Sequence, residues 1–322
     1  MRVPVLTATA YRRITLAALL ALAFIVVTGA AVRLTGSGLG CSEWPSCEPG
    51  SLTPRGESDH HDWIEFVNRT ITGLVSAAVI LAVLGAARRR PFRRDLLWLA
   101  LGLVAGVLGQ IVLGGLTVLF DLWPPLVMGH FLVSMALLWN AVWLHHRAGR
   151  PEGPAVPVVR GATRRLLQAA TVCTAAVVVT GTVVTASGPH AGDADVDRLG
   201  PDLPDVARIH GIAVVVLVVV LALATARLHR EAAPVAVRGT ATSLLAVLGA
   251  QGALGYTQYF TGVPALLVGF HVALATGIWA LAVRLSLLLS ERRTSSTPAG
   301  WSAEPPTNDP GVHERRPSPS PA

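Results

Sequence analysis

Long stretches without a charged residue dominate the chain and alternate with short polar or arginine-rich segments. The uncharged stretches are 14–32, 70–87, 96–120, 122–146, 166–192, 209–226 and 239–283. A bilayer core about 30 Å thick needs about 20 apolar residues in a helix, and within lipid only helices and closed barrels satisfy their own backbone groups. The stretches are continuously apolar rather than alternating, so they predict membrane-spanning helices and not barrel strands.

The last stretch, 239–283, contains 45 residues, which is about twice the length of one span. Gly262-Val263-Pro264 interrupts it, and the stretch therefore predicts two helices. The first stretch, 14–32, follows two arginines as a signal peptide would, but it is longer than the usual apolar region of roughly 7–15 residues. We expect it to be retained. The predicted fold class is thus an all-α polytopic membrane protein with eight transmembrane helices.

The composition supports a membrane protein. The 322 residues are 52% hydrophobic and only 14% charged, whereas soluble domains carry roughly a quarter of charged residues. The mean hydropathy is +0.55. These values exclude a disordered or water-soluble globular protein, and three cysteines are too few for a disulfide scaffold.

The net charge is +7, and all 26 basic residues are arginine. A net positive charge can indicate that a protein binds nucleic acid. Here, however, most of the arginines fall in the segments on one side of the predicted membrane. With an inside N-terminus, 21 of the 26 arginines fall on one side and 12 of the 19 acidic residues on the other. The positive-inside rule then places both termini in the cytoplasm. We expect membrane lipid, and no nucleic acid, as a partner.

The two halves of the chain share a pattern of spacing. His130 follows Gln110 by 20 residues, and His271 follows Gln251 by the same 20 residues, at an offset of 141. In both cases Leu-Gly occurs three residues after the glutamine. Each half contains an even number of predicted helices, so two such copies share one orientation in the membrane.

A second match, Val-Val-Thr-Gly at 26–29 and again at 178–181, strengthens this pattern. The sequence therefore predicts two tandem four-helix repeats. Their ranges are 1–150 and 151–293. The Pro/Ser-rich tail, 294–322, cannot bury a core and is predicted to be disordered.

Three histidines, His130, His210 and His271, lie near the outer ends of predicted helices. Ionisable groups inside a membrane are costly and usually functional. His210 and His271 enter from the same side on two parallel helices, an arrangement that can hold a flat macrocycle from both faces. Neutral imidazole binds haem iron, and helix bundles bury such cofactors. Haem is the favoured interpretation; a zinc site, a proton relay and structural packing are the alternatives.

Glu65 precedes Asn68 by three residues, so the two share a helix face. Its carboxylate can stabilise the helix N-terminus and pair with Arg69. It can also act as a catalytic acid, base or charge stabiliser beside a bound substrate. Ala207 occupies the corresponding position in the second half, which indicates that one half performs chemistry and the other only binds.

Cys41 and Cys47 lie in the segment CSEWPSC of the first outer loop. On an oxidising face of the membrane, two such cysteines most simply form a disulfide. Their spacing is not that of a CxxC metal site. The bond would pin the loop, or it would serve as a redox-active pair that responds to external thiols.

Several segments together resemble one known family. They are RLTGSGLGCSEWPSC (33–47), IEFVNRTITGLV (64–75), GQIVLGGLTVL (109–119) with LVMGHF (126–131), RIHG (208–211) and GYTQYFTGVPALLVGFH (255–271). The ordered set resembles haem A synthase, the CtaA/Cox15 family, from about residue 14 to 290. The resemblance implies an oxidoreductase of the bacterial cell membrane. That family hydroxylates a methyl group of haem O in successive steps to the formyl group of haem A, which terminal oxidases then receive.

The resemblance also implies roles for individual residues. His210 and His271 would hold a haem b in the second half, and His130 would ligate the iron of the substrate haem O in the first half. Glu65 would assist catalysis, and the loop cysteines would form the family's cysteine pair. Haem O synthase and an electron acceptor would be partners.

The sequence departs from this family pattern at Asn68, where many members have a histidine. An amide is a poor iron ligand beside imidazole. His61 lies seven residues earlier, about 10 Å along a helix, and could replace the missing ligand only if the chain bends. We therefore expect a substrate haem that is five-coordinate or ligated by His61. In the second outer loop the acidic residues Asp193, Asp195 and Asp197 occur without a cysteine pair.

Two other classes of function compete with the enzyme. A dihaem b-type electron carrier linked to quinol would share the bis-histidine chemistry, and Glu65 is the feature that favours the enzyme over it. A transporter is less compatible, because no helix pair carries the chain of intramembrane Asp or Glu residues expected of an ion relay.

Overall fold

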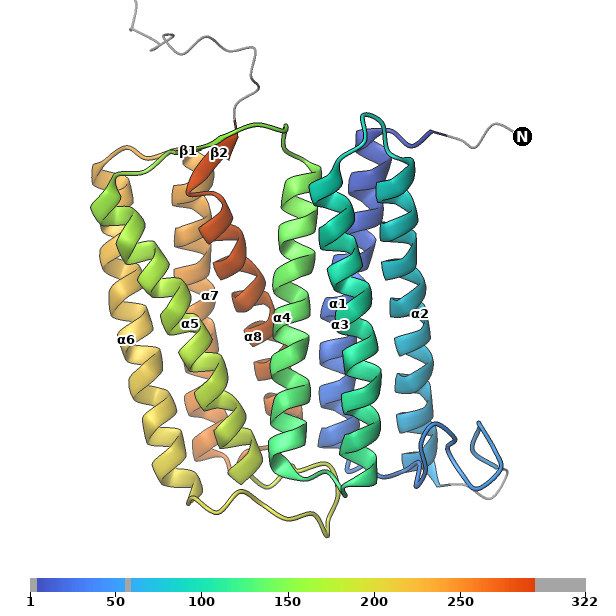
Figure 1. The fold of residues 1–322 in the computed structure, drawn as a ribbon. Helices are drawn as coiled ribbons and strands as arrows, with labels where there is room; N and C mark the ends of the chain where they lie inside the picture. The colour runs from blue at the N-terminus through green and yellow to red at the C-terminus, as the bar shows by residue number, and fades with distance from the viewer. Residues whose placement is uncertain (1–4, 56–58, 293–322) are drawn as a thin grey trace, which may run out of the picture.

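The computed structural model describes residues 5–55 and 59–292, and these residues form long helices joined by loops (Figure 1). The predicted disordered tail, 294–322, lies outside the described residues. The helices are α1 (Ala8–Leu34), α2 (His60–Arg88), α3 (Arg94–Leu119), α4 (Pro124–Ala148), α5 (Gly161–Ser187), α6 (Leu203–Arg230), α7 (Val235–Phe260) and α8 (Ala265–Leu287). Two three-residue strands, β1 (Ala155–Pro157) and β2 (Ser290–Arg292), pair antiparallel. The predicted all-α class is confirmed.

Among the described residues, seven of these helices are long and apolar enough to cross a membrane. The chain is therefore a multi-pass membrane protein. The remaining helix, α7, is 26 residues long and runs alongside the others, but it does not reach the same hydropathy. Arg238 is its only charged residue, so threonine, serine, glutamine and glycine, rather than charge, lower its hydropathy.

The break predicted in the last uncharged stretch is confirmed. Helix α7 ends at Phe260 and α8 begins at Ala265. Between them the backbone of Gly262 and Val263 adopts positive φ angles of 81° and 57°. Glycine adopts this conformation at little cost, and Pro264 then precedes the first turn of α8.

Two helices begin earlier than their uncharged stretches. Helix α2 starts at His60, where Asp59 accepts a hydrogen bond from the backbone N–H of His60. Helix α6 starts at Leu203. The first turns of both helices carry charged residues. An uncharged stretch of sequence therefore does not show where these two helices begin.

The helices form two rings of four. Within one ring α1 contacts α2, α2 contacts α3, α3 contacts α4, and α4 returns to α1. The helices α5 to α8 repeat this order of neighbours. Each ring has its own buried cluster, in which alanines recur; Ala18, Ala82 and Ala100 in the first and Ala224 and Ala241 in the second are all 1% exposed or less. Small residues let membrane helices approach closely.

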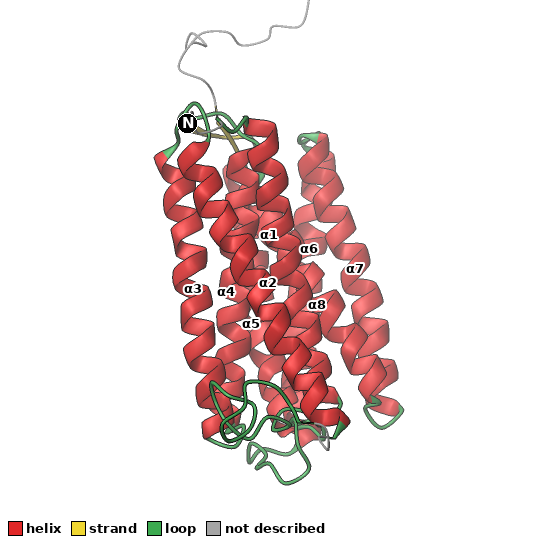
Figure 2. Cartoon of the chain, turned by 90° about the vertical axis from the view of Figure 1, so that its right-hand side faces the viewer, coloured by secondary structure: helices red, strands yellow, loops and turns green. Residues whose placement is uncertain are grey.

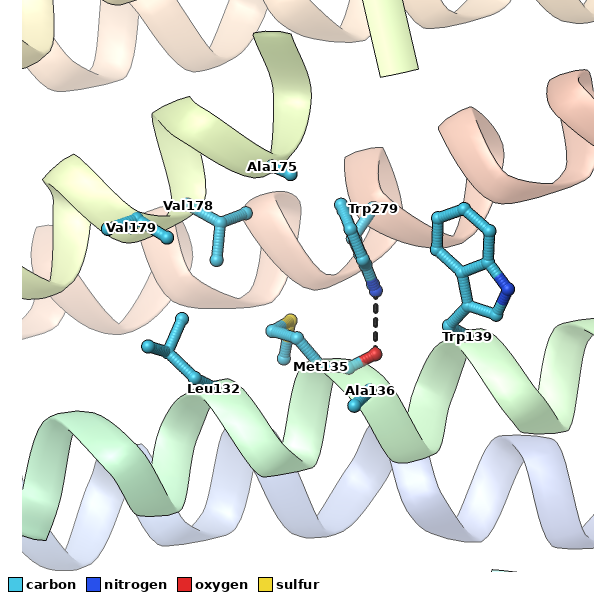
Figure 3. Close-up of a pocket in the computed structure, with 8 residues that line it drawn as sticks. All are labelled: Leu132, Met135, Ala136, Trp139, Ala175, Val178, Val179 and Trp279. Carbon is cyan, nitrogen blue, oxygen red and sulfur yellow. Dashed lines mark hydrogen bonds between the residues drawn. The ribbon is translucent and has the colours of Figure 1, made fainter. Parts of the chain in front are cut away.

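The two rings meet along α4, α5 and α8, with α1 also against α8. At this seam the indole N–H of Trp279 donates a 2.8 Å hydrogen bond to the carbonyl of Met135 (Figure 3). The rings of Trp139 and Trp279 lie 5.6 Å apart. A cavity of about 310 Å³ lies beside them, and its lining residues are Leu132, Met135, Ala136, Trp139, Ala175, Val178, Val179 and Trp279. Because no lining side chain is titratable, acid–base chemistry must lie elsewhere.

The two ends of the bundle differ. The strands β1 and β2, the start of α1 and the arginine-rich turns lie at one end, and the longer loops lie at the other (Figures 1 and 2). Exposed tryptophans occur near both ends, Trp98 and Trp143 towards the strands and Trp63 and Trp123 towards the long loops. Tryptophans at these levels are typical of the two membrane–water interfaces.

Candidate functional site

The disulfide predicted in the first long loop is present between Cys41 and Cys47. Both cysteines are buried, at 0% and 1% exposure. The backbone N–H of Cys41 donates a 2.8 Å hydrogen bond to Oε2 of Glu65 on α2. The disulfide loop is thus tied directly to the predicted catalytic carboxylate.

Glu65 is 6% exposed and forms the expected pair with Arg69, one turn later. Nε of Arg69 donates to Oε1 of Glu65 at 3.0 Å. The same guanidinium donates to the carbonyls of Glu43 and Ser46 in the disulfide loop, at 3.0 and 2.9 Å. The loop, the arginine and the carboxylate are therefore joined by hydrogen bonds at the N-terminal end of α2.

Asn68 lies one turn below Glu65, and its amide is held by α1. The hydroxyl of Thr28 donates to Oδ1 of Asn68 at 2.8 Å. Helix α2 is continuous from His60, so the bend that would bring His61 to the level of Asn68 is absent. His61 lies instead in the first turn of α2, at the long-loop end of the bundle, where its Nδ1 is 2.9 Å from the hydroxyl of Ser37.

Asp59, His60 and His61 offer potential metal-ligand atoms within 4.8 Å of one another at the start of α2. These groups already have partners within the protein. Asp59 caps the helix and pairs with His60. The backbone N–H of His60 lowers the pKa of the Asp59 carboxyl. This cluster is a helix cap, and it gives no reason to expect a separate metal.

His130 lies in the second turn of α4 and packs against α3. Gly114 makes this approach possible, because an added Cβ there would lie 3.3 Å from Cε1 of His130. The amide of Gln110 donates to the backbone carbonyl of His130 at 3.0 Å. Nδ1 of His130 is buried and has no hydrogen-bond partner among the described residues.

His271 in α8 has the same surroundings. A Cβ on Gly255 of α7 would lie 3.3 Å from its Cε1, and the amide of Gln251 donates to its carbonyl at 2.9 Å. Its Nδ1 is also buried and without a partner among the described residues. The spacing shared by the two halves therefore corresponds to one local geometry that occurs twice.

His210 in α6 packs against α5 in a related way. A Cβ on Gly181 would lie 3.3 Å from its Cε1. The hydroxyl of Thr180 lies 3.0 Å from its Nδ1 and also donates to the carbonyl of Ala176. That hydroxyl can accept the proton of Nδ1, which leaves Nε2 as the basic nitrogen.

Thr28 and Asn68 on the α1–α2 pair correspond to Thr180 and His210 on the α5–α6 pair. The first ring thus has an asparagine where the second has a histidine. Sequence reasoning missed these threonine contacts, although the repeated Val-Val-Thr-Gly pattern was a signal for them. It also missed Ser37, whose contact with His61 has no sequence signal.

A family model described as COX15-CtaA, cytochrome oxidase assembly protein, matches residues 12–192, more than half of the chain. The chain belongs to the COX15-CtaA family. The match includes the disulfide loop, Glu65 and His130.

Relatives of this COX15-CtaA protein align over both of its rings. A protein named "Heme A synthase" from Symbiobacterium thermophilum is 31% identical over 291 residues, covering 84% of this chain and 92% of the relative. One with the same name from Halalkalibacterium halodurans is 28% identical over 266 residues, covering 78% and 85%. A third, from Shouchella clausii, is 26% identical over 287 residues, covering 84% and 93%.

Proposed function

We propose that this protein is a haem A synthase, an oxidoreductase that converts a methyl group of haem O to the formyl group of haem A for terminal oxidase assembly. The family description and the names of the relatives support this activity. The observation that carries the proposal is the set of three half-buried histidines, His130, His210 and His271. Each packs against a glycine of the neighbouring helix at the long-loop end of the bundle.

The first ring is the proposed substrate side. His130 ligates the iron of haem O, and Glu65 acts on protons near the reacting methyl group. Both oxygens of Glu65 already accept hydrogen bonds from Cys41 and Arg69. Oε1 accepts from both Nε and Nη2 of Arg69, whereas Oε2 accepts only from the N–H of Cys41 among the described residues. Oε2 therefore retains a second lone pair, and Glu65 can hold a proton there without losing its position. A positioned acid or base contributes typically 10²–10⁴-fold to a rate.

The second ring is the proposed haem b side, with His210 and His271 as the two iron ligands. Their surroundings fit this cofactor, because Thr180 lies against Nδ1 of His210 and leaves its Nε2 basic, and Gly255 lets α7 approach the ring of His271 closely. A hydrogen bond from the other ring nitrogen orients a ligating histidine. When bound, haem b would supply one-electron transfer. The histidines hold and orient it, and the apolar ring of helices excludes water.

The substrate haem is proposed to be five-coordinate, with His130 as its one protein ligand. Asn68 stands where many members of the family have a histidine, and its side-chain oxygen already accepts a hydrogen bond from Thr28. His61 remains the alternative ligand from the sequence. Its distance of about 10 Å along a continuous helix argues for a role at the entrance instead.

We further propose that the rings are tandem repeats of one orientation, 1–150 and 151–293, with eight transmembrane helices and both termini in the cytoplasm. The matching order of helix neighbours supports the repeat. The equal glycine–histidine approaches support it independently. The excess of arginines in the segments on one side of the predicted membrane supports the orientation.

A dihaem b-type electron carrier linked to quinol would use the same histidines. Glu65, held by the disulfide loop in one ring only, favours an enzyme over that carrier. Haem O synthase, as the source of substrate, and an electron acceptor are proposed partners.

The test is co-expression with a haem O synthase in cells that make no haem A. Haems extracted from the membranes are separated by reversed-phase chromatography and identified by mass. We expect haem A in cells with the wild-type protein and only haem O with an empty vector. Unchanged haem O in both, with the protein present and red, would support the electron carrier.

A further inference from the structure

Three arginines are buried at the strand-bearing end of the bundle, away from the histidines. Arg89 and Arg93 lie in the turn between α2 and α3, and Arg147 lies in the last turn of α4. Their exposures are 6%, 2% and 6%. Figure 1 shows this turn beside the end of α4. Burial of an arginine is unfavourable unless the charge is paired.

Among the described residues, one carboxylate is ion-paired with this cluster. Asp95 accepts from Nη2 of Arg93 at 2.7 Å and from Nε of Arg147 at 3.0 Å. Arg89 has no such partner and donates to the carbonyl of Pro91 at 2.6 Å. Glu152 and Arg292 also face the cluster, but their opposite charges cancel. The cluster therefore has an excess of positive charge.

Several donors in this cluster are unused. Nε of Arg89, Nη1 of Arg147 and the hydroxyl of Tyr11 are buried without a hydrogen-bond partner among the described residues. Tyr11 is 0% exposed. A buried donor left without an acceptor costs about 1–3 kcal/mol, and more when it is charged. Burial, with the charge of Arg93, lowers the pKa of Arg89. These donors are available to an acceptor, and the excess positive charge of the cluster favours an anionic one.

The depth of the cluster identifies the class of anion. Trp98 and Trp143 lie about one turn closer to the bundle centre and are 61% and 41% exposed. Such tryptophans sit at the level of the lipid headgroups. Basic pockets between transmembrane helices on the cytoplasmic side bind anionic headgroups, and guanidinium groups match phosphate oxygens in geometry and charge.

We propose that Tyr11, Arg89 and Arg147 form a binding site for one anionic phosphate group at the cytoplasmic end of the first ring. The group neutralises the excess charge and accepts hydrogen bonds from the unused donors. It comes from the headgroup of an anionic phospholipid or from free phosphate. The site is separate from the haem chemistry and is independent of the proposed function.

The test compares the thermal unfolding midpoint of the purified protein with added phosphatidylglycerol, phosphatidylcholine or inorganic phosphate. Arg89→Met removes the unpaired guanidinium, and Arg94→Met, at an exposed position nearby, is the matched control for lost charge. We expect phosphatidylglycerol or phosphate to raise the midpoint of the wild type and the control by several degrees, and that of Arg89→Met by less than one degree. Phosphatidylcholine should have little effect. Equal responses of the two variants would overturn the proposal.

Phosphorus analysis of the wild type provides a readout that does not depend on a variant. After exhaustive detergent washing we expect about one phosphorus atom retained per protein molecule. Its partition into the organic phase identifies a phospholipid, and its partition into water identifies free phosphate. Loss of all phosphorus, together with no shift of the midpoint by any addition, would also overturn the proposal.

Discussion

The backbone N–H of Cys41 donates a 2.8 Å hydrogen bond to the carboxylate of Glu65, and this contact joins the disulfide loop to α2. Arg69 reinforces the contact by binding both the carboxylate and the carbonyls of the loop. Glu65 thereby keeps a defined position although it lies at the end of a helix.

Glu65→Gln tests the role of this carboxylate. Glutamine keeps an oxygen that can accept from Cys41, but it cannot take up a proton at pH 7. We expect haem A formation to fall by about 10²-fold or more, while haem b content stays at the wild-type level. The rate is measured as haem A formed per molecule of purified protein.

Glu43→Gln is the matched control, because Glu43 is an exposed carboxylate of the same loop and offers Arg69 only its backbone carbonyl. It should retain the wild-type rate. An equal loss in both variants would show that negative charge in the loop, and not Glu65 itself, is required.

Replacement of both Cys41 and Cys47 by serine tests the loop as a support for Glu65. Without the disulfide the loop becomes more mobile, so the N–H of Cys41 is presented to Glu65 less of the time. We expect a lower rate of haem A formation with unchanged haem b content, because the segment from Cys41 to Cys47 contacts α2 and α3 of the first ring. Simultaneous loss of haem b would instead indicate general unfolding.

Gly255→Ala tests the close approach of α7 to His271. The added methyl group would lie 3.3 Å from Cε1 of the imidazole, so the ring must shift. We expect a measurable loss of haem b in the purified protein, quantified by the pyridine haemochrome spectrum. Gly252→Ala, in the same helix and with nothing within 4 Å of the added Cβ, should retain full haem b. Equal haem content in both would contradict the glycine argument.

Asn68→His tests the coordination of the substrate haem. Histidine at this position supplies a second axial ligand. We expect electron paramagnetic resonance of the ferric, haem O-loaded protein to change from a high-spin to a low-spin signal at the substrate site. His61→Ala should leave the wild-type high-spin signal unaltered. A low-spin wild type that becomes high-spin in His61→Ala would identify His61 as the ligand and overturn the five-coordinate proposal.

The sequence was sufficient to predict the helices because lipid imposes one simple rule on a spanning segment. The turn at Gly262-Val263-Pro264 was predictable because glycine and proline close together in the sequence interrupt a helix. The structure has positive φ angles at Gly262 and Val263. The start of α2 at His60 was not predictable from the apolar pattern, because the first turns of this helix are polar. The pairing of Ala155 with Arg292 was also missed, because it joins residues far apart in the chain.

For the candidate site, the sequence located the histidines and the Glu65–Arg69 pair. It could not predict that Glu65 accepts from Cys41, since a backbone donor has no signature of its own. The Thr180–His210 contact was likewise hidden, because it depends on how α5 packs against α6. Spacing along one helix is visible in a sequence, whereas contacts between helices require the fold.

The most direct test of the account is the haem content of purified His210→Ala, His271→Ala and His130→Ala proteins, with the exposed His229→Ala as control. Haem b and haem A are quantified separately after extraction from cells that supply haem O. We expect loss of haem b in the His210 and His271 variants. In the His130 variant we expect retained haem b without haem A, and in the control wild-type content of both. Full haem b in the His271 variant, or a colourless wild type under ample haem supply, would contradict it.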